Sequence, residues 1–288
     1  MKSKVYFSRA ITPEKVVELY ELLGKELGGK VAIKLHSGEV GNQNFLKPDF
    51  WAPIIAKVGG TVTECNTAYD GGRDTTEKHL KTLKLHGWSE HFDVDLLDAE
   101  GPDMVLDIPN GKKIKKNFVG KNLKNYDSLL VLSHFKGHPM GGYGGALKQL
   151  SIGIASSYGK AYIHGVSDVS KIWTADHDSF LEAMADAALS VVEYFKGNAV
   201  YINVMKNMSV DCDCCAVAED PCIKDIGILI SADPVAIDQA CIDLVYAATD
   251  DPGQKHFLER VESRNGVHTI EAAAELNVGS REYELIEI

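Results

Sequence analysis

Val31-Ala32-Ile33-Lys34-Leu35-His36 is a short apolar run that ends on polar side chains, a pattern typical of a buried strand in a parallel sheet. A helical pattern lies on each side of it. The preceding one begins with Thr12 as N-cap and Pro13 in the first turn, and we expect it to end at Gly28-Gly29. The following one covers residues 49–58. The run therefore predicts a strand between two helices.

The same alternation continues along the chain. We predict further strands at residues 5–7, 61–67, 103–108, 128–133, 200–204, 226–230 and 283–288, and further helices at residues 75–86, 180–195, 234–248, 256–262 and 270–276. Strands and helices that alternate on short loops are typical of βαβ units. The sequence thus predicts an α/β fold with a mainly parallel sheet flanked by helices. We expect one domain over residues 1–288, or two lobes that cover residues 1–150 and 151–288.

Composition excludes several classes of partner. The chain has 41 acidic and 30 basic residues and a formal net charge of -11, which argues against nucleic acid or an anionic membrane surface as a partner. The one basic cluster, residues 112–116, is interpreted as the solvated face of a hairpin. No apolar run approaches the ~18–20 residues of a membrane span, and residues 1–10 do not resemble a signal peptide. We therefore expect a cytoplasmic protein.

A glycine-rich loop follows the strand predicted at residues 128–133. Residues 134–148 contain five glycines, among them Gly144 and Gly145, together with the candidate catalytic residues His134, Lys136, His138 and Lys148. Glycines let a backbone approach a ligand closely and favour anions. Imidazoles offer a proton near neutral pH or a lone pair to a metal. A flexible turn with incidental histidines is the alternative, and we favour a binding loop for a small anionic ligand.

Four of the six cysteines fall within eleven residues: Cys212, Cys214, Cys215 and Cys222. Crowding of this kind in a reducing compartment points to metal binding or redox chemistry more than to disulfides. The spacing matches neither the usual Cys-x-x-Cys pairs of zinc sites nor bacterial ferredoxin runs. We take these four residues as candidate ligands of an iron–sulfur cluster or another transition metal. Redox-active thiols and inert structural cysteines are the alternatives.

Polar side chains also follow the other predicted strands. In parallel sheets functional residues gather where the carboxyl ends of the strands meet. That rule would bring together Lys34, His36, Asp70, Arg73, His134 and Lys136. Arg73, near a helix start, suits a carboxylate or a phosphate. We count Lys34, His36 and Arg73 as candidate cofactor-binding residues, with a solvated strand end and plain helix capping as the alternatives. Asp238, one turn into a later helix, is a candidate support for the cysteine loop.

Several of these motifs occur together in one known family. The chain resembles a prokaryotic family numbered 362 among domains of unknown function through residues 31–39, 133–138, 144–148, 212–214, 225–227 and 233–238. Many members look like fusions to ferredoxins, which implies an association with iron–sulfur clusters. Residues 162–178, where the cluster motifs of those members would lie, contain no cysteine here.

A second resemblance concerns the glycine-rich loop. His138 and residues 144–148 are similar to a stretch of lactate racemase-like proteins, which bind a nickel-pincer nucleotide. The resemblance implies acid–base chemistry for His138, cofactor attachment at Lys148 and nickel ligation by His164.

Three functional hypotheses follow. The first is a metal- or iron–sulfur-binding protein with redox-type or related chemistry on a small anionic ligand, which would require a redox partner protein. The second is a non-catalytic carrier that passes a cluster or cofactor to an acceptor protein. The third is a racemase-like isomerase with a cofactor bound to Lys148. The first requires the glycine-rich loop and the cysteine loop to share one pocket.

Overall fold

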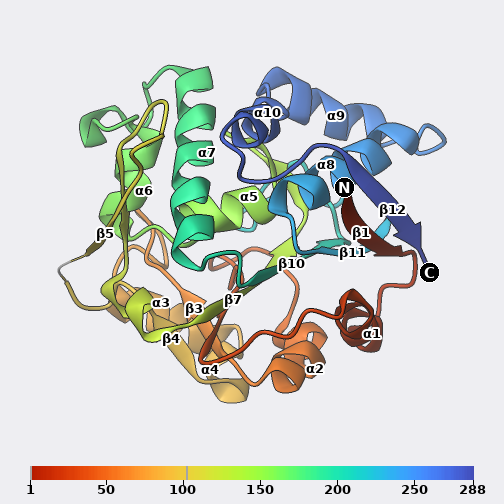
Figure 1. Cartoon of the computed structure of the whole chain (residues 1–288), viewed down its shortest axis with the longest axis horizontal. Coiled ribbons are helices and arrows are strands. Elements are labelled where there is room, and N and C mark those ends of the chain that lie inside the picture. Colours follow the sequence, from red (N-terminus) through yellow and green to blue (C-terminus); the bar gives the residue numbers. More distant parts are fainter. Residues whose placement is uncertain (1, 102) are drawn as a thin grey trace.

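The computed structural model describes residues 2–101 and 103–288 and is built around one large sheet (Figure 1). Its strand order is β12 (Tyr283–Glu287), β1 (Ser3–Ser8), β11 (Gly227–Ser231), β10 (Ala199–Met205), β7 (Ser128–His134), β2 (Val31–Lys34), β3 (Thr61–Glu64) and β4 (Val94–Leu96). Only the two pairings of β11, with β1 and with β10, are antiparallel. The predicted α/β fold with a mainly parallel sheet is confirmed, and strands from both halves of the sequence lie in the one sheet.

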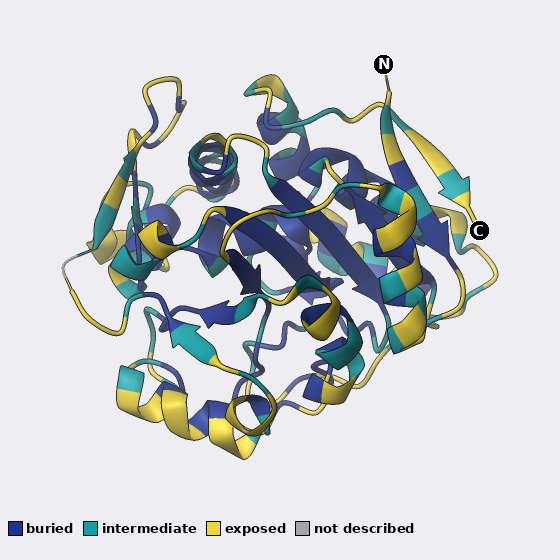
Figure 2. Ribbon diagram, turned by 60° about the horizontal axis from the view of Figure 1, so that its bottom comes forward, coloured by how far each residue is buried: buried dark blue, intermediate teal, exposed yellow. Residues whose placement is uncertain are grey.

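Helices cover both faces of this sheet. One layer contains α1 (Pro13–Leu23), α2 (Pro48–Val58), α3 (Thr76–Leu85) and α4 (Trp88–His91), and the other contains α5 (Ala146–Lys148), α6 (Ser157–His164), α7 (His177–Tyr194), α8 (Pro234–Ala247), α9 (Gln254–Ser263) and α10 (His268–Glu275). Alternate residues of the strands enter two separate hydrophobic cores, as period-2 geometry requires. Leu130 packs with the first layer and Leu129 with the second. The central strands are consequently buried on both faces (Figure 2).

The structure corrects two predicted boundaries. Thr12 caps α1 as expected, by accepting a hydrogen bond from the Lys15 N–H, but the helix ends at Gly24 rather than at Gly28-Gly29. Gly24 adopts the left-handed conformation (φ 66°) that terminates helices, so it stops the helix before the later glycine pair. The strand predicted at residues 61–67 ends at Glu64, because the Asn66 N–H donates to the Asp98 carboxylate instead of to a neighbouring strand.

Two small hairpins lie outside the large sheet. β5 (Met104–Asp107) pairs with β6 (Lys116–Val119), and the basic cluster occupies the turn between them, as predicted. β8 (Lys136–His138) pairs with β9 (Gly142–Gly144), so the glycine-rich loop is an ordered hairpin. Three short helical segments complete the description: η1 (Lys121–Asn125), η2 (Gln149–Gly153) and η3 (Val169–Lys171). In the described part of the chain, none of the helices has both the length and the apolar character needed to cross a bilayer.

Candidate functional site

The glycine-rich hairpin and the cysteine loop meet at the carboxyl end of β7. The hairpin continues directly from this strand, and the cysteine loop follows the neighbouring strand β10. A backbone hydrogen bond of 2.8 Å from Gly137 N to Ser209 O joins the two segments. The Cys214 Sγ lies 3.9 Å from the His138 Nε2. Two stretches far apart in sequence therefore form one site.

His138, Cys212 and Cys214 bring three candidate ligand atoms together. One such atom from each residue lies within 4.8 Å of the other two. Around a tetrahedral zinc ion with the usual bond lengths, neighbouring nitrogen and sulfur ligands would lie about 3.5–3.8 Å apart. A small contraction of the group would therefore enclose a metal ion, so this His/Cys/Cys group could hold one. Cys215 and Cys222 do not belong to it.

Asp213, between the two cysteines, anchors their loop. Its carboxylate is 1% exposed and accepts hydrogen bonds from the His134 Nδ1, at 2.9 and 3.0 Å. The Lys136 Nζ lies 3.0 Å from the same carboxylate. Burial acts to raise the pKa of Asp213, but these two partners outweigh it and hold the pKa below its usual value. The other His134 nitrogen, Nε2, lies 2.6 Å from the Lys206 carbonyl, so both ring nitrogens are engaged in holding the loop.

Amide side chains hold the same loop from the other side. Asn42, Gln43 and Asn44 donate hydrogen bonds of 2.8–2.9 Å to the backbone carbonyls of Cys215, Ala218 and Glu219. The Glu39 N–H also donates to the Asp213 carbonyl at 2.8 Å. The segment after β2 thereby fixes the backbone that carries the thiols, although the two segments lie about 170 residues apart in sequence.

The two thiols of the group differ in protonation. Burial acts to raise the pKa of Cys212, but a hydrogen bond from Cys214 and the charges of Lys148 and Lys136 hold it well below its usual value. The Lys148 Nζ lies 3.7 Å from the Cys212 Sγ. The pKa of Cys214 is raised well above its usual value, first by its hydrogen bonds to Cys212 and Cys215 and then by burial. The pair therefore holds one thiolate beside one thiol, and a thiolate is the form that binds metals.

His138 has a defined tautomer. Its Nδ1 accepts hydrogen bonds from the backbone N–H groups of Met140, at 3.1 Å, and Gly141, at 2.8 Å. Burial lowers the pKa of this histidine to about 4, so the ring is neutral at pH 7. A neutral ring that accepts at Nδ1 carries its proton on Nε2, the nitrogen that faces Cys214. His138 is thus positioned to donate an Nε2–H hydrogen bond toward the thiols.

Gly145 is required by packing against Asp238. A Cβ at this glycine would lie 2.4 Å from the Asp238 Oδ1. The Asp238 carboxylate accepts hydrogen bonds from the backbone N–H groups of Ala146, at 2.8 Å, and Leu147, at 2.9 Å. Asp238 therefore holds the end of the glycine-rich loop, not the cysteine loop. At Gly144 a Cβ would lie 3.4 Å from the Lys148 side chain, so this glycine leaves room for the lysine.

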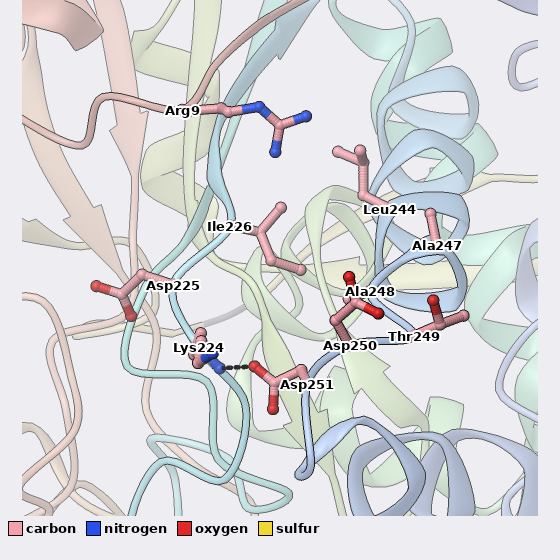
Figure 3. Close-up of a pocket in the computed structure, with 10 residues that line it drawn as sticks. All are labelled: Arg9, Lys224, Asp225, Ile226, Leu244, Ala247, Ala248, Thr249, Asp250 and Asp251. Carbon is pink, nitrogen blue, oxygen red and sulfur yellow. Dashed lines mark hydrogen bonds between the residues drawn. The ribbon is translucent and has the colours of Figure 1, made fainter.

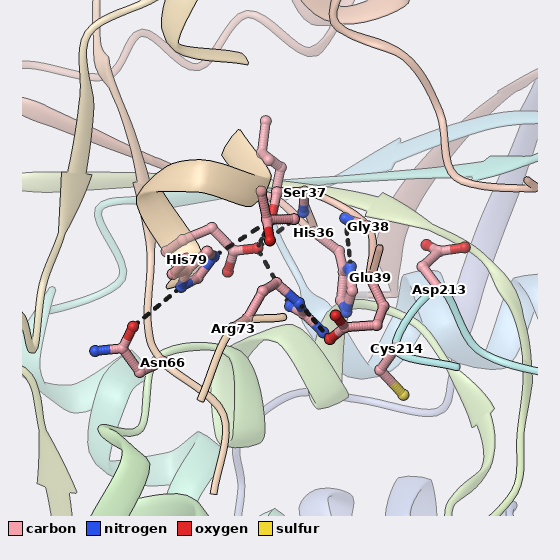
Figure 4. Close-up of polar contacts among 12 residues, drawn as sticks. His36, Ser37, Gly38, Glu39, Asn66, Arg73, His79, Asp213 and Cys214 are labelled. Carbon is pink, nitrogen blue, oxygen red and sulfur yellow. Dashed lines mark hydrogen bonds and ion pairs between the residues drawn. The ribbon is translucent and has the colours of Figure 1, made fainter. Parts of the chain in front are cut away.

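A cavity of about 40 Å³ adjoins the thiols. Residues on its wall include Lys34, His36, Glu64, Tyr69, Arg73, Lys148, Lys160 and Cys214. Lys34 forms a buried ion pair with Glu64 at 2.6 Å, and Arg73 pairs with Glu39 at 3.1 Å. Figure 4 shows Arg73 and Glu39 on the side of the site where Cys214 lies. Burial lowers the pKa of His36 well below its usual value, so this ring is neutral as well.

A larger hollow of about 370 Å³ lies elsewhere on the molecule (Figure 3). Arg9, Asp225, Asp250 and Asp251 line it together with Ile226 and the end of α8. It includes none of the three residues of the His/Cys/Cys group. Its walls are mostly surface loops, so we place the candidate site at the smaller cavity.

Comparison with known families agrees with this architecture. The model of the family described as Domain of unknown function (DUF362) matches residues 31–243. The chain belongs to this family. The match includes the His/Cys/Cys group and the whole cavity wall, which in the DUF362 chain are built from segments between β2 and the cysteine loop.

Two solved structures are similar to the DUF362 chain. One is the lactate racemase apoprotein from Thermoanaerobacterium thermosaccharolyticum, at 16% identity and a TM-score of 0.43, with 69% of this chain and 50% of that chain covered. The other is a protein from Thermotoga maritima, at 14% identity and a TM-score of 0.44, with 92% and 59% covered. The chain thus spans half to three-fifths of the length of these structures. No curated protein matches it.

The sequence-predicted residues of the DUF362 chain fall into distinct places. Lys34, His36, Arg73, Lys148 and Cys214 line the cavity, whereas His134 and Lys136 hold Asp213. His164 stacks on Phe180, and its Nδ1 lies 2.7 Å from the Lys160 carbonyl. The Cys222 thiol donates to the Met208 carbonyl at 3.7 Å. Asp70 is exposed.

Sequence reasoning missed several residues of the cavity wall, among them Glu64, Tyr69 and Lys160. Glu64 ends β3 and could have been found by the same strand-end rule that identified Lys34. Tyr69 directly precedes the turn that carries Arg73, and Lys160 lies on α6. Neither of these two carries a motif that sets it apart in the sequence.

Proposed function

We propose that this protein binds a transition-metal ion through the thiolates of Cys212 and Cys214 and supports redox-type or related chemistry on a small anionic ligand. The observation that carries the proposal is the group of His138, Cys212 and Cys214, whose candidate ligand atoms lie within 4.8 Å of one another next to a cavity. Thiolate ligands favour soft or borderline metals. A site with fewer protein ligands than the metal's coordination number leaves a position for substrate, as catalytic zinc sites do.

The number of sulfurs favours a single ion over a cluster. Iron–sulfur clusters of the [4Fe–4S] type are held by four cysteines. Among the described residues, the group at the site contains two cysteines, and Cys215 and Cys222 stand outside it. A mononuclear centre is therefore the form of metal site that we propose, with the remaining positions open to the ligand.

The tautomer of His138 supports a role as a hydrogen-bond donor to sulfur. A histidine that binds a metal through Nε2 usually donates its other N–H to an acceptor. Here Nδ1 instead faces two backbone donors, Met140 N and Gly141 N. The Nε2 proton would have to leave before a metal could bind there. We therefore assign His138 to donating an Nε2–H hydrogen bond to a sulfur beside the metal, and the two cysteines to holding the metal.

Metal titration of the anaerobically purified protein tests this assignment. Co²⁺ is the probe, because thiolate-to-cobalt absorption reports how many sulfurs bind. We expect one equivalent to bind to the wild type with thiolate absorption, and Cys212→Ser and Cys214→Ser to lose most of it. Cys222→Ser is the matched control and should bind like the wild type, because its sulfur lies outside the group. Wild-type protein that gives no thiolate absorption would contradict the proposal.

His138→Gln separates the two roles of this residue. We expect it to retain the thiolate–cobalt absorption, with an affinity within about tenfold of the wild type, since two sulfurs still chelate the ion. A loss of cobalt as complete as that of Cys214→Ser would instead make His138 a ligand and contradict its assignment as a hydrogen-bond donor.

A further inference from the structure

The cavity beside the thiols carries an excess of positive charge. Four basic side chains line it, namely Lys34, Arg73, Lys148 and Lys160, against one carboxylate, Glu64. Lys34 is neutralised by Glu64, and Arg73 is paired with Glu39 from outside the wall. Within the described residues, Lys148 and Lys160 form no ion pair of 4 Å or less with a carboxylate. Lys148 faces the Cys212 sulfur at 3.7 Å, and Lys160 donates to the Ala155 carbonyl. The basic groups of the wall still outnumber its carboxylates, and this excess favours an anion.

Arg73, which lies on the wall of this cavity, has a buried donor without a partner in the described part of the chain. The residue is 3% exposed, and its Nε donates to the Glu39 Oε2 at 3.1 Å. Its Nη1 lies 3.9 Å from the Glu64 Oε1. The Nη2 is buried and has no hydrogen-bond partner among the described residues. Leaving a charged donor unsatisfied in the interior is costly, so a missing acceptor is the simplest explanation of this arrangement.

The volume of the cavity limits which anions can bind in it. A volume of about 40 Å³ corresponds to roughly three water-sized groups. A carboxylate has three heavy atoms, and its two oxygens match the planar donor set of a guanidinium. A phosphate group has five heavy atoms. A nucleotide phosphate would in addition have to bring its sugar through the same small space.

We propose that this cavity binds the carboxylate of a small organic acid, with Arg73 and the ammonium groups of Lys148 and Lys160 as its donors. The acid would be about as small as formate or acetate, and Cys214 would lie on the wall beside it. This inference deepens the proposed function by naming its ligand class. It does not need the metal to be present, so the two can fail separately.

Titration of chelator-treated, metal-free protein with acetate and formate tests the inference, with chloride at equal ionic strength as the control. Calorimetry measures the affinity. Fluorescence gives a second readout, because Trp173 is 63% exposed and its ring centroid lies 5.9 Å from that of Tyr69 on the cavity wall. Trp51 and Trp88 are buried. We expect saturable binding of the carboxylates that chloride does not reproduce.

Two variants locate the binding. Arg73→Lys keeps the charge but removes the free guanidinium donor, and we expect the acetate affinity to fall about tenfold or more, as for loss of a hydrogen bond to a charged group. Arg260→Lys is the matched control, since Arg260 pairs with Asp211 at 3.1 Å outside the cavity wall. It should bind acetate within about twofold of the wild type, which corresponds to less than about 0.5 kcal/mol.

Folding of each variant is checked by near-ultraviolet circular dichroism. Should Arg73→Lys not fold, Lys160→Gln replaces it, with the same expected direction. Three results would overturn the inference: no saturable carboxylate binding to folded wild type, unchanged acetate affinity in the folded cavity variant, or binding of phosphate without binding of acetate. If the protein bound acetate normally but did not bind cobalt, the metal proposal would be wrong and the carboxylate proposal would stand.

Discussion

Replacement of Asp213 by asparagine removes the charge that holds the cysteine loop and leaves its volume almost unchanged. The carboxylate is buried and lies 2.9 Å from the His134 Nδ1 and 3.0 Å from the Lys136 Nζ. Removal of one partner from a buried ion pair costs about 3–5 kcal/mol, because the other charge stays buried without compensation. An asparagine oxygen can still accept from His134, so we expect the lower end, a loss of about 3 kcal/mol of unfolding free energy at pH 7.

Urea denaturation followed by far-ultraviolet circular dichroism measures this loss. Asp211→Asn is the control, because Asp211 lies on the same loop but its pair with Arg260 is partly exposed, and such pairs contribute about 1 kcal/mol or less. The Asp213 variant should also bind Co²⁺ more weakly, since the loop that presents both thiols loses its anchor. A loss of stability no larger than that of Asp211→Asn would refute the assignment of Asp213 as the anchor.

Two further predictions concern packing and pH. Gly145→Ala should lose about 1–3 kcal/mol of stability, since its Cβ would lie 2.4 Å from the Asp238 Oδ1, whereas Gly28→Ala, with nothing within 4 Å, should change little in the same denaturation assay. Burial acts to lower the pKa of His268, but hydrogen bonds to Glu182 and Glu271 raise it on balance. The stability from this pair is fully present below the unfolded pKa of about 6.5 and is lost as pH rises through the higher folded pKa. Wild type should therefore exceed His268→Gln in thermal stability at pH 6, and the two should converge by about pH 8–9; an equal difference at both pH values would contradict this.

Local patterns in the sequence were sufficient for most of the fold. The β-strand at residues 31–34 and the capped helix after Thr12 are encoded by short-range periodicity and caps, which do not depend on distant residues. The end of that helix was predicted wrongly because the amphipathic pattern continues past Gly24. Gly24 adopts the left-handed conformation, which ends the helix despite this pattern. Such a choice depends on backbone conformation, which residue type alone does not determine.

The candidate site was predictable only in part. The strand-end rule found Lys34, His36 and Arg73, and the structure brings all three to one cavity. The partners of His134 and Lys136 could not be predicted, because Asp213 reaches them only once β7 and β10 are paired. Their predicted role in catalysis therefore stays a prediction, while their contacts show that they hold the cysteine loop.

The amide side chains of Asn42, Gln43 and Asn44 have a kinetic consequence. They donate to three carbonyls of the cysteine loop, those of Cys215, Ala218 and Glu219, so the thiols cannot move outward while these hydrogen bonds last. An ion bound there would leave only while the segment is briefly open. The less often the segment opens, the longer the ion would stay bound. Transfer of a metal to an acceptor protein is favoured by a mobile loop, whereas hydrogen bonds hold this cysteine loop on both sides.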